Sequence, residues 1–208
     1  MSILAAPPSP RLVDALFRIT ADQYHEMIDV GIVPEDASIE LLDGMIVFKD
    51  RSDLREGPMS HGPKHRLAVR LLTKLASRID SARRHFQVQL PIRLTPFDEP
   101  EPDGAVVQGA DRDFEERLPT AEDLACVIEI ASSSLERDSE DKLRKYAAAG
   151  IVQYVIVNLR QDHVEVYSKP DRAGQTYAAK TIAAGTGVVH LNLGGGESLE
   201  VPAAEILP

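Results

Sequence analysis

Two carboxylates occupy unusual places in the sequence, beside or inside runs of apolar residues. Asp103 directly precedes the short run "GAVV", and Glu129 lies within "LACVIEI", residues 124–130. An unpaired carboxylate buried in such a run costs several kcal/mol. If the two runs form neighbouring strands, both carboxylates can face one point at a sheet edge, where carboxylates and waters can hold Mg²⁺. A metal there would offset the burial of Glu129, and the carbonyl of Ile130 would be a natural further ligand.

A lysine follows these carboxylates on a predicted helix. Lys142 and Tyr146 are four residues apart and share one helix face with Asp138. A helix that packs back on the strand of Glu129 can point Lys142 at the carboxylates, where a lysine can orient a metal-bound water or stabilise phosphate charge. The alternative is a solvated surface charge, and spacing alone does not favour Lys142 over Lys145.

These motifs together resemble the Uma-two family of restriction endonucleases, within the PD-(D/E)XK nuclease superfamily. The resemblance rests on "PDG" at 102–104, "IEI" at 128–130 and the segment "SSSLERDSEDKLRKYAAAGIVQYVIVN" at 132–158. It extends upstream to "ELLDGMIV" at 40–47 and "MSHGPKHRLAVRLLTKL" at 59–75. Each motif is weak alone, but the combined pattern is specific and runs from about Thr20 to Tyr167.

The resemblance implies a restriction-endonuclease-like fold and cleavage of DNA phosphodiesters that depends on Mg²⁺ or Mn²⁺. The superfamily's usual lysine lies two residues after the second acid, where this chain has Ala131. The family pattern moves this lysine to the helix, where Lys142 matches it. The implied catalytic residues are Asp103, Glu129 and Lys142. The implied metal ligands are Asp103, Glu129 and Glu40, and the possible substrate or supporting contacts are His65, Ser132 and Tyr146.

Each of these residues also has a structural interpretation. Asp103 belongs to a Pro-Asp-Gly sequence that is common in turns, and Glu129 can form a structural ion pair or lie on an exposed face. Glu40 can be an exposed strand residue before a hairpin, and Ser132 a loop or capping residue. His61 and His65 fit no zinc signature, so a surface or substrate contact is the better interpretation for both.

The elements that must position these residues can be predicted from the pattern of the chain. Helices are expected at 20–30, 64–80 and 132–149, and a hairpin around Asp43-Gly44. Strands are expected at 85–94, 105–108, 124–131, 152–159 and 162–170, followed by one or two more and a loose C-terminal end. Strands cluster instead of alternating with helices, which indicates an α+β fold, a mixed sheet flanked by helices. We expect one domain at 18–208 after a flexible leader at 1–17.

Composition limits the possible partners. The net charge is −10 with a pI of about 5.1, which argues against coating nucleic acid by bulk charge but leaves room for a local basic face. No apolar run is long enough for a membrane helix, and the single cysteine favours a cytoplasmic location. DNA is the expected substrate, and a homodimer is plausible because duplex cleavage needs two cuts. The alternatives are a catalytically inactive interaction or DNA-binding module, and a phosphohydrolase acting on small nucleotides.

Overall fold

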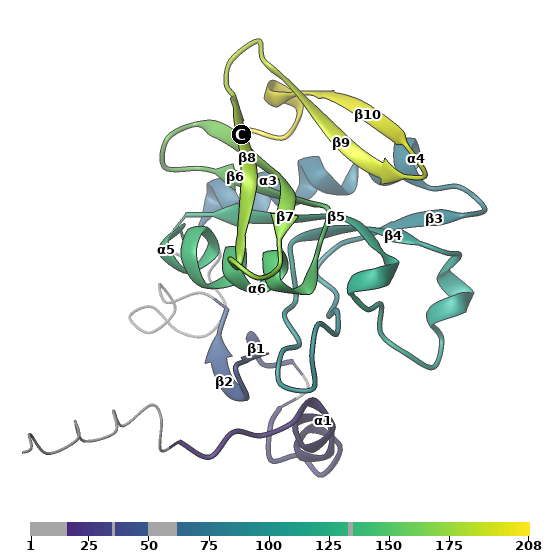
Figure 1. Cartoon of the computed structure of the whole chain (residues 1–208), viewed down its shortest axis with the longest axis vertical. Helices are drawn as coiled ribbons and strands as arrows, with labels where there is room; N and C mark the ends of the chain where they lie inside the picture. The colour runs from purple at the N-terminus through teal and green to yellow at the C-terminus, as the bar shows by residue number, and fades with distance from the viewer. Residues whose placement is uncertain (1–15, 35, 50–61, 133–134) are drawn as a thin grey trace, which may run out of the picture.

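A mixed six-stranded sheet organises the chain in the computed structural model, which describes residues 16–34, 36–49, 62–132 and 135–208 (Figure 1). The strand order is β3-β4-β5-β6-β7-β8, in which β5 and β6 are parallel and all other neighbours are antiparallel. The strands are β3 (Arg84–Gln87), β4 (Gly104–Gln108), β5 (Leu124–Ala131), β6 (Gln153–Asn158), β7 (His163–Asp171) and β8 (Thr176–Ala183). The mixed sheet with flanking helices is the α+β arrangement that the sequence predicted. The leader predicted at 1–17 lies outside the described residues, apart from its last two.

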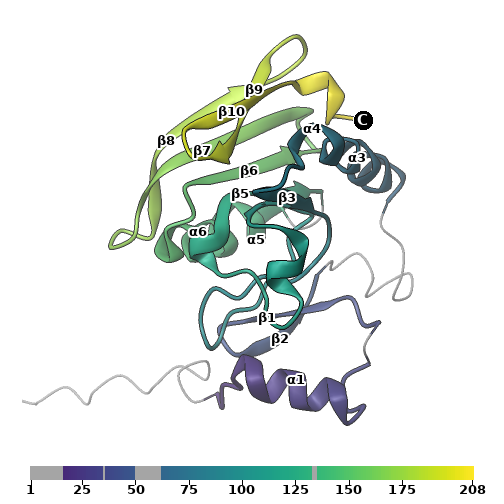
Figure 2. The ribbon, with the colours of Figure 1, turned by 90° about the vertical axis from the view of Figure 1, so that its right-hand side faces the viewer.

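Helices and a second hairpin cover the two faces of the sheet (Figure 2). One face carries α3 (Pro63–Thr73), α4 (Ala76–Ile79) and the hairpin of β9 (Val188–Gly194) and β10 (Glu197–Pro202). The opposite face carries α5 (Leu135–Arg137), a π-helical turn (Asp138–Lys142) and α6 (Leu143–Ala149). All eight residues of β5 are buried as a result. Within the described ranges, none of the helices has both the length and the apolarity that a bilayer crossing requires.

The N-terminal elements pack beside one end of the sheet. Helix α1 (Ala21–Asp29) lies within the helix expected at 20–30 and begins with a capping box, in which Thr20 and Gln23 exchange hydrogen bonds. Strands β1 (Ile39–Leu42) and β2 (Met45–Phe48) form the expected hairpin. Its two turn residues, Asp43 and Gly44, have φ values of 53° and 70°, the left-handed conformation that an Asp-Gly turn adopts readily.

Four predictions about the elements need correction. The strand expected at 85–94 ends at Gln87, because Gln89 has φ 51° and turns the chain away from the sheet edge. The helix expected at 64–80 is interrupted between α3 and α4. The helix expected at 132–149 contains the π-helical turn. The C-terminal part forms three strands, β8 to β10, instead of one or two and a loose end, because side chains such as Leu191 and Val201 are buried in the core.

A polar network ties together β6, β7 and β8. Glu165 on β7 is 6% exposed, and its carboxylate accepts hydrogen bonds from Asn158 Nδ2 at 3.0 Å and Tyr167 Oη at 2.6 Å. His163 Nε2 and Lys180 Nζ lie 2.9 and 2.7 Å from the same carboxylate. Burial alone would raise the pKa of Glu165, but these partners outweigh it and lower the pKa to about 2.

This network makes stability depend on pH in the acid range. Because the folded pKa lies below the ordinary value of 4.5, the ionised carboxylate stabilises the fold above that value, and the contribution disappears as the pH falls toward about 2. Glu165→Gln should therefore lower the Tm at pH 7, and the difference from the wild type should shrink below about pH 4.5. Thermal unfolding monitored by circular dichroism checks this. A Tm difference that stays constant throughout would show that the charge of Glu165 has no such role.

Candidate active site

Strands β4 and β5 bring Asp103 and Glu129 to the same end of the sheet. Gly104 pairs with Ile128 in antiparallel register. One residue beyond this pair, Asp103 therefore lies opposite Glu129. The backbone N–H of Ile130 donates a hydrogen bond to Asp103 Oδ2 at 2.8 Å. The two acids are 7% and 4% exposed. The expectation that their segments are neighbouring strands is thus met by the pairing of β4 and β5.

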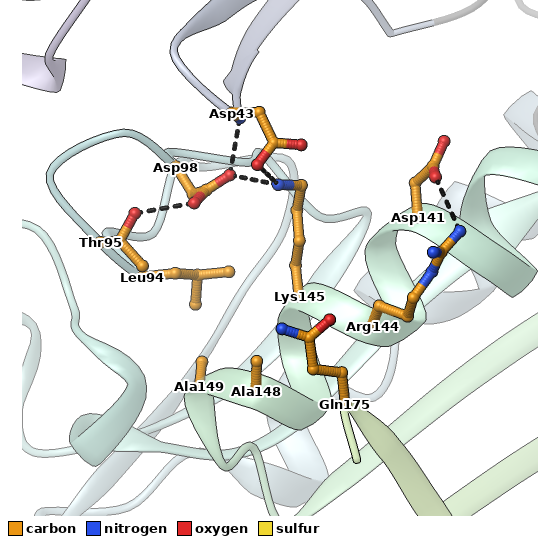
Figure 3. Close-up of a pocket in the computed structure, with 10 residues that line it drawn as sticks. All are labelled: Asp43, Leu94, Thr95, Asp98, Asp141, Arg144, Lys145, Ala148, Ala149 and Gln175. Carbon is orange, nitrogen blue, oxygen red and sulfur yellow. Dashed lines mark hydrogen bonds and ion pairs between the residues drawn. The ribbon is translucent and has the colours of Figure 1, made fainter. Parts of the chain in front are cut away.

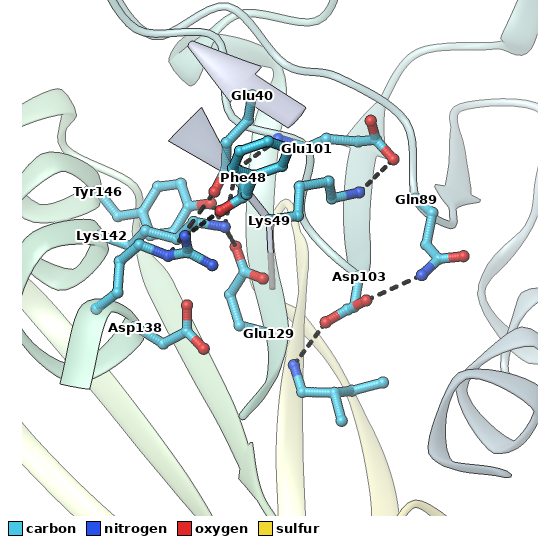
Figure 4. Close-up of polar contacts among 12 residues, drawn as sticks. Glu40, Phe48, Lys49, Gln89, Glu101, Asp103, Glu129, Asp138, Lys142 and Tyr146 are labelled. Carbon is cyan, nitrogen blue, oxygen red and sulfur yellow. Dashed lines mark hydrogen bonds and ion pairs between the residues drawn. The ribbon is translucent and has the colours of Figure 1, made fainter. Parts of the chain in front are cut away.

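Asp103 is held by one residue of helix α3 and by one residue of the bend after β3. His65, in the first turn of α3, places Nε2 3.3 Å from Asp103 Oδ1. Gln89 Nε2 donates a hydrogen bond to the same oxygen at 3.2 Å (Figure 4). Burial alone would raise the pKa of Asp103, but His65 and the N–H of Ile130 outweigh it and lower the pKa below its usual range. Asp103 is therefore ionised at neutral pH.

Lys142 reaches Glu129 from the helical side of the sheet. Its Nζ donates to Glu129 Oε1 at 2.9 Å and lies 2.9 Å from Glu40 Oε2 on β1. Tyr146 Oη donates to the same Glu129 oxygen at 2.8 Å. The side chains of Glu40, Glu129 and Lys142 are at most 5% exposed. The structure thus assembles a buried cluster in which one ammonium group lies between two carboxylates (Figure 4).

The neighbouring lysine takes a different direction. Lys145 Nζ lies 2.6 Å from Asp43 Oδ1 and 2.7 Å from Asp98 Oδ1. These three residues line a cavity of about 480 Å³ between the turn of the β1–β2 hairpin and α6 (Figure 3). Sequence spacing did not separate Lys142 from Lys145, but the structure does, because only Lys142 contacts Glu129.

The turn that carries Lys142 is π-helical, with hydrogen bonds that reach five residues instead of four. It spans Asp138–Lys142, and both end residues are buried. Such turns are rare and occur often at functional sites. Asp138 lies close enough to Glu129 and Lys142 to raise the pKa of both. The π-helical turn therefore belongs to the local structure that positions the lysine.

The cluster has more negative than positive charge. Burial is the main reason why the pKa of Glu129 rises to about 8; Lys142 opposes the rise, and Asp138, Asp103 and Glu40 add to it. Burial alone would lower the pKa of Lys142, but Glu129 and Glu40 outweigh it and raise the pKa above its ordinary value. Lys142 is therefore charged, and Glu129 is stabilised by a proton or by a further cation.

The remaining predicted residues differ in their surroundings. Tyr146 contacts Glu129, and His65 contacts Asp103. Ser132 directly follows β5 and is half-buried. His61 lies outside the described residues. Glu40 contacts Lys142 and accepts a hydrogen bond from the backbone N–H of Glu101 at 3.3 Å. Its Oε1 has no hydrogen-bond partner among the described residues.

Several residues near the acids were not anticipated from the sequence. Gln89 bonds to Asp103, and Lys49 pairs with Glu101 and helps to lower the pKa of Asp103. Arg137 donates a hydrogen bond to the carbonyl of Phe48 and lies 3.9 Å from Glu40 Oε1. Lys49 and Gln89 lie outside the motifs of the resemblance, and Arg137 lies inside the segment 132–158 but has no role implied by it. The only available signal was proximity in sequence to the hairpin, to strand β3 and to the helix that carries Lys142.

The donor set fits a hard divalent cation in part. Two ionisable carboxylates on adjacent strands match Mg²⁺, which commonly binds one or two carboxylates and keeps several waters for substrate oxygens. The surplus negative charge around Glu129 supports the same fit. Over the described ranges, however, no three His, Cys, Asp or Glu side chains converge as a metal-binding group. Glu40, predicted as a third ligand, lies instead across Lys142 from Glu129.

The sequence matches a known protein family over most of its length. A family model, Uma2, described as "Putative restriction endonuclease", covers residues 21–203. The chain belongs to the Uma2 family. The resemblance predicted from about Thr20 to Tyr167 is therefore confirmed, and the Uma2 match continues through the β9–β10 hairpin.

One solved structure supports the fold of this Uma2 chain. It is a protein from Anabaena variabilis ATCC 29413, described as a putative nuclease belonging to DUF820. The similarity covers 90% of the Uma2 chain and 97% of that protein, with a TM-score of 0.63 and 17% sequence identity. No curated protein matches the sequence. The shared architecture confirms the restriction-endonuclease-like fold.

Proposed function

We propose that this Uma2 chain is an endonuclease that hydrolyses DNA phosphodiester bonds with Mg²⁺ or Mn²⁺. The observation that carries the proposal is the contact of Lys142 with Glu129, on the strand next to Asp103. This chain has Ala131 at the superfamily's usual lysine position. Lys142 instead supplies the ammonium group beside Glu129, the second acid. Two acids and a lysine at one end of neighbouring strands are groups that can support metal-assisted phosphodiester hydrolysis.

Each residue has a separate role in this proposal. Asp103 and Glu129 would hold the cation, which supplies Lewis acidity and lowers the pKa of a bound water. Asp103 is kept ionised by His65 and the N–H of Ile130. Lys142 presents a permanent positive charge to the negative charge that develops on the phosphate. Glu40 is assigned as a positioning residue, because its contact with Lys142 keeps the ammonium charged and oriented.

The proposal extends to the setting in which the protein acts. Duplex cleavage needs two cuts, so we infer a homodimer. Cys126 is a buried free thiol, which agrees with a reducing, cytoplasmic location.

Calorimetry with Mn²⁺ tests the metal site directly. Wild-type protein should bind Mn²⁺, and Glu129→Gln should reduce the affinity by at least about tenfold, because the amide keeps the shape but loses the charge. Glu99→Gln is the matched control, since Glu99 is a 3% exposed glutamate whose side chain pairs with Arg93 and His25 instead of Lys142. It should bind Mn²⁺ like the wild type.

The same titration separates the proposal from the inactive alternative. A non-catalytic module of the same fold is favoured by one observation, the lack of a converging three-ligand group in the described part of the chain. No Mn²⁺ binding by the wild type, or binding that Glu129→Gln leaves unchanged, would support that module and reject the nuclease.

A further inference from the structure

The segment that contains α3 and α4 is strongly basic within an acidic protein. The whole chain has a net charge of −10, yet residues 57–79 contain no Asp or Glu and include five Lys or Arg. These five residues are Lys64, Arg66, Arg70, Lys74 and Arg78. A local excess of positive charge against such a background is an electrostatic footprint of the kind that polyanions recognise.

The basic residues gather on the solvent side of the helix. Ala68 and Leu72 are fully buried and face the core below β5. Arg66, Arg70 and Lys74 recur every four residues, and all three are exposed. Figure 2 shows α3 at the outside of the molecule, with none of the described elements beyond it. These three residues, two on α3 and one at its C-cap, therefore define the outer face of α3 as a solvent-exposed basic stripe.

Ion pairs among the described residues account for only part of this charge, since Arg78 pairs with Glu205 at 2.6 Å. No acidic side chain of the described ranges lies within 4.0 Å of Arg70 or Lys74. Lys64 pairs with Asp162 at 3.6 Å, but both side chains are more than 60% exposed, so the pair contributes little. Arg70 and Lys74 thus present charge that no acidic side chain in the described part of the chain neutralises.

The stripe begins at the proposed catalytic acids. His65, in the first turn of α3, contacts Asp103. From Arg66 to Lys74 the helix rises about 12 Å at 1.5 Å per residue. One DNA strand advances about 3.4 Å per phosphate along its axis, so the stripe can follow about three to four phosphates.

We infer that the outer face of α3, through Arg70 and Lys74, binds the phosphate backbone of duplex DNA and leads it to the Asp103 end of the sheet. The inference rests on the proposed nuclease function and adds the surface that holds the substrate. Backbone contacts of this kind position a duplex without reading its sequence. The DNA cleaved by this protein is therefore held largely by charge at α3.

Binding of a fluorescently labelled duplex to metal-free protein tests the inference, because it does not depend on cleavage. Arg70→Gln/Lys74→Gln should weaken binding at least about tenfold at about 0.1 M salt. The slope of log K against log salt, measured from about 50 to about 200 mM, should become shallower by about 1.8, or 0.9 for each lost contact. Glutamine is a good helix former, so α3 should persist.

The matched control removes the same number of charges elsewhere. Arg112→Gln/Lys169→Gln changes two exposed basic residues outside α3, and it should keep the wild-type affinity and slope. Arg70→Lys/Lys74→Arg should also bind like the wild type, because it keeps the charge. An Arg70→Gln/Lys74→Gln protein that behaves like the control, or loses binding to duplex RNA but not to duplex DNA, would overturn the inference.

The outcomes for the two proposals are distinguishable. DNA binding that depends on Arg70 and Lys74, without any metal-dependent cleavage, would reject the nuclease and keep the binding surface. Metal-dependent cleavage that persists while Arg70→Gln/Lys74→Gln leaves DNA binding unchanged would keep the nuclease proposal and reject the binding surface. A wild-type protein that binds no duplex DNA would reject the surface directly.

Discussion

Asp103→Asn should abolish metal-dependent DNA cleavage while the protein stays folded. The amide can still accept the N–H of Ile130, which now donates to Asp103 Oδ2 at 2.8 Å, so the backbone connection between β4 and β5 is kept. The lost charge removes one of the two proposed metal ligands. Charge stabilisation by a metal is worth several kcal/mol, so kcat/KM should fall by about 10³-fold or more. Cleavage of a labelled duplex in Mg²⁺ and Mn²⁺ measures this effect.

Asp98→Asn is the matched control for this prediction. Asp98 and Asp103 are equally buried at 7%, but Asp98 bonds to Thr95, Lys145 and the N–H of Asp43 in the cavity of Figure 3. Its substitution should lower the Tm and leave the rate close to wild type. If Asp103→Asn cleaves at the wild-type rate, Asp103 has no part in the chemistry.

The elements around the site could be predicted because their signals are local. The apolar run of β5 and the Asp43-Gly44 turn of the hairpin each indicate their structure within a few residues. Asp103 and Glu129 could be predicted as site residues because each carboxylate borders or interrupts a run of apolar residues. The antiparallel pairing of β4 with β5 places both carboxylates at the same end of the sheet.

The contacts that complete the site could not be predicted, because they depend on long-range packing. The partner of Lys142 other than Glu129 is Glu40, about a hundred residues earlier in the chain. Gln89 reaches Asp103 through a left-handed backbone that glutamine seldom adopts, so propensity argues against it. The basic residues of α3 are visible in the sequence. Their position beside the proposed catalytic acids follows only from the contact of His65 with Asp103.

Replacing Lys142 should have the largest combined effect on activity and stability. Lys142→Met removes the ammonium between Glu40 and Glu129, whose side chains are at most 5% exposed. Breaking a buried pair from one side costs about 3–5 kcal/mol, because the remaining charge stays buried and uncompensated. Cleavage should fall by about 10³-fold, since a positioned positive charge at the phosphate is lost. Differential scanning calorimetry and cleavage kinetics measure the two effects.

A second variant separates catalysis from folding. Glu40→Gln/Lys142→Met removes one of the uncompensated carboxylates, so much of the lost stability should return. Cleavage should not return, because glutamine supplies no charge at the position of Lys142. If activity recovers together with the Tm, the role of Lys142 is structural and the nuclease proposal loses its lysine.

Lys145→Met is the matched control for Lys142→Met, because it changes the same residue type three positions further along the chain. Lys145 pairs with Asp43 and Asp98, and of the two lysines only Lys142 contacts Glu129. The Lys145 variant should lose some stability and keep its cleavage rate. A rate that falls equally in both lysine variants would mean that the helix as a whole, and not the ammonium beside Glu129, supports the reaction. Ala131 would then mark a chain that has lost the superfamily's lysine without replacing it.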